Sequence, residues 1–262
     1  MLDEAGIESA GAEARWIVRA TLGNDAPLTH DAASDSARRA LELAARRASR
    51  EPLQYVLGTA PFRRLELAVG PGVFIPRPET ELVAERAMAL LPEGGTVVDV
   101  GTGSGAIALS IADERAGVTV LATEVSEPAL SWARKNISAT GLPVQLFHGD
   151  LFDPLPQRFR GNVDVVVSNP PYVAGSDPLP EEVRDHEPHT ALYSGSSGLE
   201  VIERLTAGAH EWLCPNGSLV LEIGESQAES ASAMVLASGF EGVTVTEDLS
   251  HRPRIVSATL SA

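Results

Sequence analysis

The fold of this chain is decided by the stretch Val165-Val166-Val167-Ser168-Asn169-Pro170-Pro171-Tyr172-Val173. Its β-branched run without polar alternation predicts a parallel strand that is buried on both faces. The two prolines end this strand because they lack the N–H that a sheet or a helix needs, and they hold the preceding residues extended. We therefore expect a stiff hook at the carboxyl end of a central strand, the edge where open α/β sheets bind ligands.

The hook offers hydrogen-bond acceptors in a fixed arrangement. The Asn169 side-chain oxygen and the Pro170 carbonyl can accept both hydrogens of an –NH₂ group, while Tyr172 can lie against a flat group. Such a hook suits a planar amino or amide nitrogen that must be aimed at a reaction partner. The alternative is an ordinary proline-rich turn at the end of a strand.

Composition limits the classes of protein to consider. The chain has 262 residues, 44% of them hydrophobic, which is enough for one large core or a core plus a small domain. The net charge of -16 argues against direct binding of nucleic acid through its phosphates. One cysteine, Cys214, excludes an internal disulfide, and the six histidines show no metal-ligand spacing, so we expect no metal. Without a signal sequence or a long apolar run, we expect a cytoplasmic protein away from membranes, and a monomer.

Three segments differ in pattern. Residues 1–50 predict two helices, one ended by Gly23 and one over residues 34–49, that serve either as a scaffold or as a docking module for a partner. Residues 51–75 predict a β-hairpin linker. In residues 76–262 a first helix is expected to be capped by Glu79 or Thr80, and strands then alternate with helices.

This alternation predicts an α/β fold with a mostly parallel, doubly wound sheet. Strands are expected over residues 96–100, 118–124, 144–148, 163–168 and 218–223, with two late strands over 242–245 and 254–260. Helices are expected over residues 106–112, 127–138, 199–213 and 225–238.

A nucleoside cofactor is indicated by a glycine loop followed by an acid. The loop Gly101-Thr102-Gly103-Ser104-Gly105 separates a strand from a helix, and Glu124 ends the next strand, where an acid accepts from ribose hydroxyls. This sequence pattern would also fit a nicotinamide dehydrogenase. S-adenosylmethionine fits better, because Asp99 precedes the loop where it can reach an ammonium group and because a dehydrogenase has no use for Asn-Pro-Pro-Tyr.

A second acid follows the third strand of this part of the chain. Asp150 stands where a carboxylate can accept from an adenine amino group, or where it can cap a turn. The acidic, proline-punctuated stretch 178–192 follows the hook and is expected to form either the rim over the substrate or an ordinary solvated loop.

These motifs resemble a known family. The Asp-x-Gly-x-Gly-x-Gly and Asn-Pro-Pro-Tyr pair is typical of class I amino methyltransferases. The flanking blocks Glu51-Pro52-Leu53-Gln54-Tyr55-Val56-Leu57-Gly58, Phe74-Ile75-Pro76-Arg77-Pro78-Glu79-Thr80-Glu81 and Glu187-Pro188-His189-Thr190-Ala191-Leu192 are similar to the release-factor glutamine N5-methyltransferases, the HemK family. The similarity runs over essentially the whole chain. In the C-terminal Asp-x-x-Gly-x-x-Arg pattern of the family, His251 stands where glycine is usual.

The resemblance implies a Rossmann-like, seven-stranded methyltransferase domain with a small helical N-terminal substrate-docking domain. It implies S-adenosyl-L-methionine as cofactor and the glutamine of the Gly-Gly-Gln motif of class I peptide chain release factors as substrate. Carried over by residue, Gly101 to Gly105, Glu124 and Asn169 hold the cofactor, and Asp150 and Leu151 flank its adenine. Asn169, Pro170, Pro171 and Tyr172 hold the glutamine.

The expected chemistry is orientation rather than proton abstraction. Acceptors at Asn169 and Pro170 bind the amide hydrogens more tightly as positive charge develops on nitrogen, which stabilises the transition state. No residue is required as general base. The competing activity is an N6-adenine or other amino methyltransferase of DNA or RNA, which needs the basic face that this acidic chain lacks.

Overall fold

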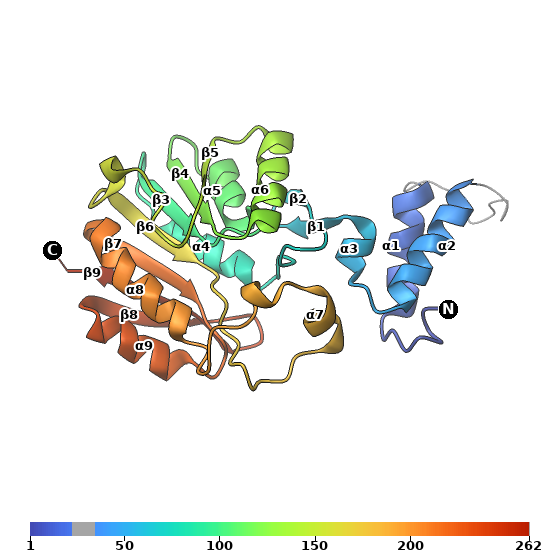
Figure 1. Cartoon of the computed structure of the whole chain (residues 1–262). Helices are drawn as coiled ribbons and strands as arrows, with labels where there is room; N and C mark the ends of the chain where they lie inside the picture. The colour runs from blue at the N-terminus through green and yellow to red at the C-terminus, as the bar shows by residue number, and fades with distance from the viewer. Residues whose placement is uncertain (23–34, 262) are drawn as a thin grey trace.

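The computed structural model describes residues 1–22 and 35–261. Figure 1 shows two N-terminal helices set apart from a large sheet, with a short helix and a hairpin between them. The N-terminal helices are α1 (Ala10–Leu22) and α2 (Asp35–Ala48), and the connecting elements are α3 (Leu53–Leu57), β1 (Thr59–Phe62) and β2 (Leu65–Ala68). The two expected helices and the hairpin are therefore present, while the expected ends at Gly23 and Ser34 lie outside the described residues.

Helix α3 was not expected from the sequence, and it joins two small cores. Val56 packs with Leu2, Ile7, Ile17 and Leu43 in the core of the N-terminal helices. Its neighbour Tyr55 belongs instead to the apolar cluster under the hairpin, and the Tyr55 hydroxyl donates to the Val73 carbonyl at 2.5 Å. One helical turn thus anchors the N-terminal helices to the remainder of the chain.

The seven-stranded sheet has the order β5-β4-β3-β6-β7-β9-β8. The pairs among β3 to β7 are parallel, and β9 pairs antiparallel with both β7 and β8, so the expected mostly parallel, doubly wound sheet is confirmed. The strands are β3 (Thr96–Val100), β4 (Thr119–Glu124), β5 (Val144–His148), β6 (Val163–Ser168), β7 (Leu213–Glu222), β8 (Phe240–Glu247) and β9 (Pro253–Leu260).

Both faces of the central strands are covered, as the β-branched run 165–167 predicted. Val166 packs in one apolar cluster with α8 and α9, whereas Val165 and Val167 pack in another with α4 and α5. These helices are α4 (Thr80–Leu90), α5 (Ala106–Glu114), α8 (Glu200–Trp212) and α9 (Ala228–Ala237), and α6 (Glu127–Thr140) lies against β4 and β5. The carboxyl ends of β3, β4 and β6 therefore meet at one edge of a rigid sheet.

Two boundaries differ from expectation by three residues or more. β7 begins at Leu213, five residues before the expected start, and pairs with Val163 across an irregularity in β6. α9 begins at Ala228, three residues later than expected, because Gln227 remains outside the helix and its side chain accepts from the Gly224 N–H.

Among the described residues, no helix has the length and apolar character needed to cross a membrane.

Candidate active site

A cavity of about 430 Å³ opens at the carboxyl edge of β3, β4 and β6. This volume is in the range of small-molecule sites. The structure brings most of the expected site residues into its wall: Gly101, Thr102, Gly103, Ser104, Glu124, Asp150, Leu151, Asn169, Pro170, Pro171 and Tyr172. Gly105 is the exception, because it precedes α5 as its N-cap residue with φ 88° and lies outside the lining.

The glycine loop is held against the end of β4 by its own backbone. The N–H groups of Gly101 and Thr102 both donate to the Thr123 carbonyl at 2.9 Å. Gly101 and Gly103 have φ of 72° and 60°, which a residue with a side chain rarely adopts, and a Cβ on either would meet nothing within 4 Å. These glycines therefore serve the turn and leave the space above it open for a ligand.

Glu124 is fixed at the end of β4 before any ligand arrives. Its Oε2 accepts from the Gly103 N–H and its Oε1 accepts from the Ser126 N–H, both at 2.8 Å. Only 7% of the residue is exposed, and it lines the cavity. Because each carboxylate oxygen has two lone pairs, the carboxylate can still accept from a pair of hydroxyls.

Asp99 lies under the loop with one oxygen unused. Its Oδ2 accepts from the Thr102 hydroxyl at 2.5 Å and from the Ala108 N–H at 3.1 Å, whereas Oδ1 is buried without a partner among the described residues. Burial raises the pKa of this carboxyl to about 7. A buried acceptor without a donor indicates a missing cation or hydrogen-bond donor at this end of the cavity.

Asp150 and Leu151 form the turn that follows β5. Leu151 has a positive φ of 44° and packs against the core on the α8 side of the sheet. The Asp150 Oδ2 accepts from Arg204 of α8 at 2.5 Å, so this side chain is held by an ion pair rather than used as a turn cap.

The Asn-Pro-Pro-Tyr hook is fastened to the sheet and leaves two acceptors uncovered. The Ser168 hydroxyl donates to the Val100 carbonyl at 2.6 Å, which ties the tips of β6 and β3. The Asn169 Nδ2 donates to the Thr80 hydroxyl at 3.0 Å. Within residues 1–22 and 35–261, no group donates to the Asn169 Oδ1 or to the Pro170 carbonyl oxygen. Both residues line the cavity, and the two acceptors expected for an –NH₂ group are not taken up by donors of the described residues.

Tyr172 is held in place by Glu222 and Gln227. Its hydroxyl lies 3.4 Å from the Glu222 Oε1, and its carbonyl accepts from the Gln227 Nε2 at 2.9 Å. Burial, followed by the negative charge of Glu222, raises the pKa of the Tyr172 hydroxyl far above its usual range. The hydroxyl therefore stays protonated, and Tyr172 lines the cavity.

The expected cap of α4 is wrong. Glu79 occupies the N-cap position without a side-chain hydrogen bond, and the Thr80 hydroxyl donates to the Glu222 Oε2 at 2.7 Å. Thr80 is therefore used by the site rather than by its own helix. Glu222, the last residue of β7, is 1% exposed.

Residues 174–192 form a rim that is closed at its base. The Val173 N–H donates to the Leu192 carbonyl at 3.0 Å and the Ser194 N–H donates back to Val173 at 2.9 Å. Within the rim, α7 (Glu181–His186) is followed by the buried Glu187, which accepts from the Ile75 N–H at 3.0 Å and pairs with Arg77. Leu179, Val183 and Thr190 line the cavity, so the expected segment 178–192 lies in its wall.

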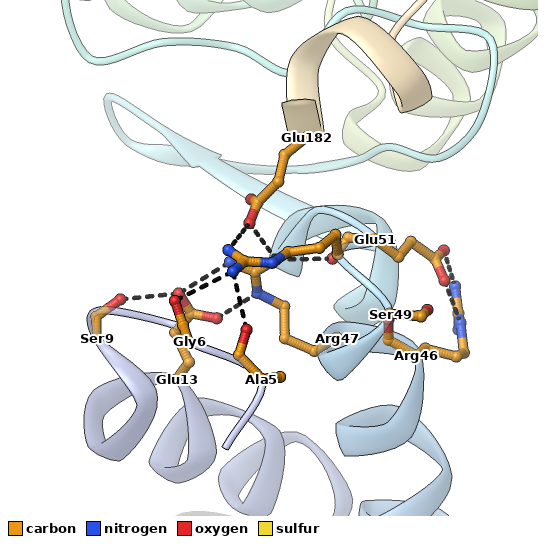
Figure 2. A network of polar contacts seen from close by, with 10 residues as sticks. Ala5, Gly6, Ser9, Glu13, Arg46, Arg47, Ser49, Glu51 and Glu182 are labelled. Carbon is orange, nitrogen blue, oxygen red and sulfur yellow. Dashed lines mark hydrogen bonds and ion pairs between the residues drawn. The ribbon is translucent and has the colours of Figure 1, made fainter. Parts of the chain in front are cut away.

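A polar network joins the rim to the N-terminal helices (Figure 2). Arg47 of α2, only 5% exposed, pairs with Glu13 of α1 at 2.5 Å and with Glu182 of α7 at 3.0 Å. Arg50 also reaches Glu182, at 3.4 Å. The Glu182 carboxylate of the rim therefore pairs with both Arg47 and Arg50.

The C-terminal turn is held together by Asp248. Asp248 accepts from the Ser250 and Arg252 N–H groups at 2.8 and 3.1 Å and from the Arg254 guanidinium at 3.3 Å. His251 takes a positive φ of 59° at the place where the family pattern has glycine. The turn therefore keeps its left-handed conformation without the glycine.

Family comparisons agree with this geometry. The Methyltransferase small domain family matches residues 70–183, and the PrmC N-terminal domain family matches residues 1–58. Over 271 aligned residues, the chain is 39% identical to the release factor glutamine methyltransferase of Geobacter sulfurreducens, covering 99% of this chain and 93% of that protein. The chain belongs to the release factor glutamine methyltransferase family. A DNA or RNA amino methyltransferase is accordingly not favoured.

Solved structures show the same fold. A methyltransferase from Pyrococcus furiosus superposes with a TM-score of 0.59 at 20% identity, covering 87% of this chain and all of that one. The 16S rRNA N2 G1207 methyltransferase of T. thermophilus, solved with AdoMet and guanosine, has a TM-score of 0.55 at 21% identity over 77% of this chain and 49% of its own. At these identities the likeness establishes the class I methyltransferase fold and nothing finer.

Several residues of the site were missed by sequence reasoning. Glu222, Gln227 and the Arg77–Glu187 pair all support the hook or the rim. Arg77 and Glu187 stand inside blocks that the resemblance had singled out, so their pairing could have been suspected. Glu222 had one signal, a lone acid at the end of an otherwise apolar strand, Ser218-Leu219-Val220-Leu221-Glu222.

Proposed function

We propose that this protein transfers a methyl group from S-adenosylmethionine to the side-chain amide nitrogen of the glutamine in the Gly-Gly-Gln motif of class I peptide chain release factors. One observation supports this most strongly. Two uncovered acceptors, Asn169 Oδ1 and the Pro170 carbonyl, line the same cavity as the glycine loop and Glu124. That arrangement suits a carboxamide placed beside a nucleoside.

The cofactor end fits S-adenosylmethionine by its donor and acceptor pattern. The unpartnered Asp99 Oδ1 suits an ammonium group, Glu124 suits the ribose hydroxyls, and Asp150 with Leu151 suits the adenine. When bound, the cofactor supplies an electrophilic methyl group on a sulfonium. The protein supplies the binding groups and the alignment, with the Gly101–Gly105 loop as the floor of the cofactor site.

Catalysis then rests on orientation. Asn169 and Pro170 accept the two amide hydrogens, so the remaining face of the nitrogen is directed along one line. Their attraction strengthens as positive charge develops on the nitrogen, and the proton that is lost afterwards leaves to water. Pro171 holds the hook rigid, and the Tyr172 ring lies against the flat amide.

The segments expected from the sequence are proposed to divide this work. Residues 76–262 bind the cofactor and the glutamine, residues 51–75 form the linker, and residues 1–50 dock the release factor. The contacts of Arg47 and Arg50 with Glu182 support the docking role, because they connect the N-terminal helices directly to the rim.

The deciding experiment incubates the purified protein with S-adenosylmethionine and a purified class I release factor. Mass spectrometry is expected to find one added methyl group, confined to the Gly-Gly-Gln peptide. A release factor with that glutamine replaced by alanine is the control and should remain unmodified. Methylation elsewhere, or none at all, would contradict the proposal.

A further inference from the structure

A chain of hydrogen bonds runs behind Asn169 to a buried carboxylate. The Asn169 Nδ2 donates to the Thr80 hydroxyl at 3.0 Å, and that hydroxyl donates to the Glu222 Oε2 at 2.7 Å. Thr80 is 4% exposed and Glu222 is 1% exposed. Neither residue belongs to the Asn-Pro-Pro-Tyr motif or to the glycine loop.

The direction of this chain is set by its last member. An ionised carboxylate only accepts hydrogen bonds, so the single Thr80 hydroxyl proton must point toward Glu222. The Thr80 oxygen is then left as an acceptor on its other side. Only the –NH₂ group of Asn169 can satisfy it, which turns the Asn169 Oδ1 toward the cavity.

We propose that Glu222 and Thr80 are positioning residues that fix which way round the Asn169 amide is held. This inference rests on the proposed function, because a carboxamide substrate needs an acceptor at that point. The opposite orientation would present the Asn169 –NH₂ group to the substrate –NH₂ group, two donors that cannot bond. Thr80 and Glu222 thus determine whether the Asn169 amide is oriented to accept from the substrate.

The surroundings of Glu222 keep it available for this role. The Tyr172 hydroxyl donates to its other oxygen at 3.4 Å, and Arg254 of β9 attracts its charge while Glu79 before α4 opposes it. Burial raises the pKa of Glu222 to about 7, against the lowering effects of Thr80 and Arg254. The ionised fraction, and with it the directing effect, therefore grows as the pH rises through neutrality.

The test compares Thr80→Val and Thr80→Ser in methylation of a class I release factor with saturating S-adenosylmethionine. T80V keeps the side-chain shape but removes the hydroxyl, so kcat is expected to fall by about tenfold or more. T80S keeps the hydroxyl and should retain most of the activity. Cofactor affinity, measured by calorimetry, should be unchanged in both. The matched control is T206V, which removes a buried hydroxyl from α8 whose one partner among the described residues is the Ile202 carbonyl.

A double-mutant cycle separates positioning from general damage. If Thr80 acts through Asn169, T80V should cost almost nothing further in an N169A background. In a second readout, the wild-type kcat should rise with pH through about 7, while the kcat of E222Q should be low and flat. E222Q also carries the test if T80V fails to fold.

The outcomes distinguish the two proposals. A wild-type protein that methylates no release factor overturns the proposed function, and the positioning role with it. An active wild type with an equally active T80V, or full additivity of T80V and N169A, overturns the positioning role alone.

Discussion

The two ends of the cavity are built in different ways. Around the glycine loop at the cofactor end, contacts are short in sequence: Asp99 reaches Thr102 and Ala108, three and nine residues away, and Glu124 reaches Gly103 over 21. At the substrate end, Thr80 bonds Asn169 across 89 residues and Glu222 across 142. The glycine-loop part of the first end is encoded in one strand-loop-helix unit and the strand beside it, whereas the second end depends on segments that meet only in the folded protein.

This difference separates binding from turnover. The groups at the cofactor end already hold one another and need only receive a ligand, so losing one should weaken binding. The groups at the substrate end fix the direction of a single amide, so losing one should slow the reaction while the cofactor still binds. Substitutions at the two ends should therefore affect different measured quantities.

The largest effect is expected for Asn169→Ala, which removes the orienting oxygen. By analogy with losing one polar stabiliser, kcat should fall by about 10²–10³. Calorimetry should show that S-adenosylmethionine affinity survives, because the glycine loop and Glu124 do not depend on this side chain. Normal turnover by this variant would remove the orienting role, and loss of cofactor binding would break the division between the two ends.

Glu187→Ala tests whether the rim depends on long-range contacts. It leaves the buried Ile75 N–H and the Arg77 guanidinium without their shared acceptor, across 112 and 110 residues. We expect about 2–3 kcal/mol lower stability in urea unfolding and a higher KM for the release factor. Cofactor affinity should stay near the wild-type value, and an unaltered KM would show that the rim does not bind substrate.

Glu124→Ala should weaken cofactor binding and leave turnover largely intact. The substitution removes a carboxylate that is positioned to accept from hydroxyls, so cofactor affinity should weaken by about 1.5–3 kcal/mol in calorimetry. At saturating S-adenosylmethionine, kcat should recover most of its wild-type value. An unchanged affinity would contradict the ribose assignment.

The pH dependence of cofactor binding probes Asp99. Burial raises its pKa from the ordinary value of 3.8 to about 7, so the folded protein holds a proton that the unfolded chain has released. Between these two values stability falls as pH rises, because the folded state binds more protons there. A cationic ligand prefers the ionised carboxylate, so affinity should decline by up to about tenfold for each pH unit below 7. Calorimetry in buffers of different ionisation enthalpy should detect the released proton, and D99N should remove the slope.

The sequence-based expectations agree with the structure where a feature is set by residues close to it in sequence. The central strand, the glycine loop and the hook follow from β-branched runs, positive-φ glycines and prolines, each of which acts on its own neighbours. The expected cap by Glu79 or Thr80 failed for the opposite reason. Thr80 is the first residue of α4 rather than its cap, and its hydroxyl donates to a carboxylate 142 residues away. Nothing near Thr80 in the sequence could reveal that partner.

The smallest effect is expected at the C-terminal turn, which needs a left-handed residue at His251 and carries Asp248 and Arg254. His251 takes φ 59°, a conformation that costs a residue with a side chain about 1–2 kcal/mol and costs glycine almost nothing. His251→Gly should therefore relieve strain, although the greater freedom of glycine in the unfolded chain offsets about 0.4–1 kcal/mol of it. The net gain should be below about 1 kcal/mol in urea unfolding, with kcat and KM unchanged, because the His251 side chain lies outside the cavity. Loss of activity in this variant would show that the turn does more than carry Asp248 and Arg254 behind Glu222.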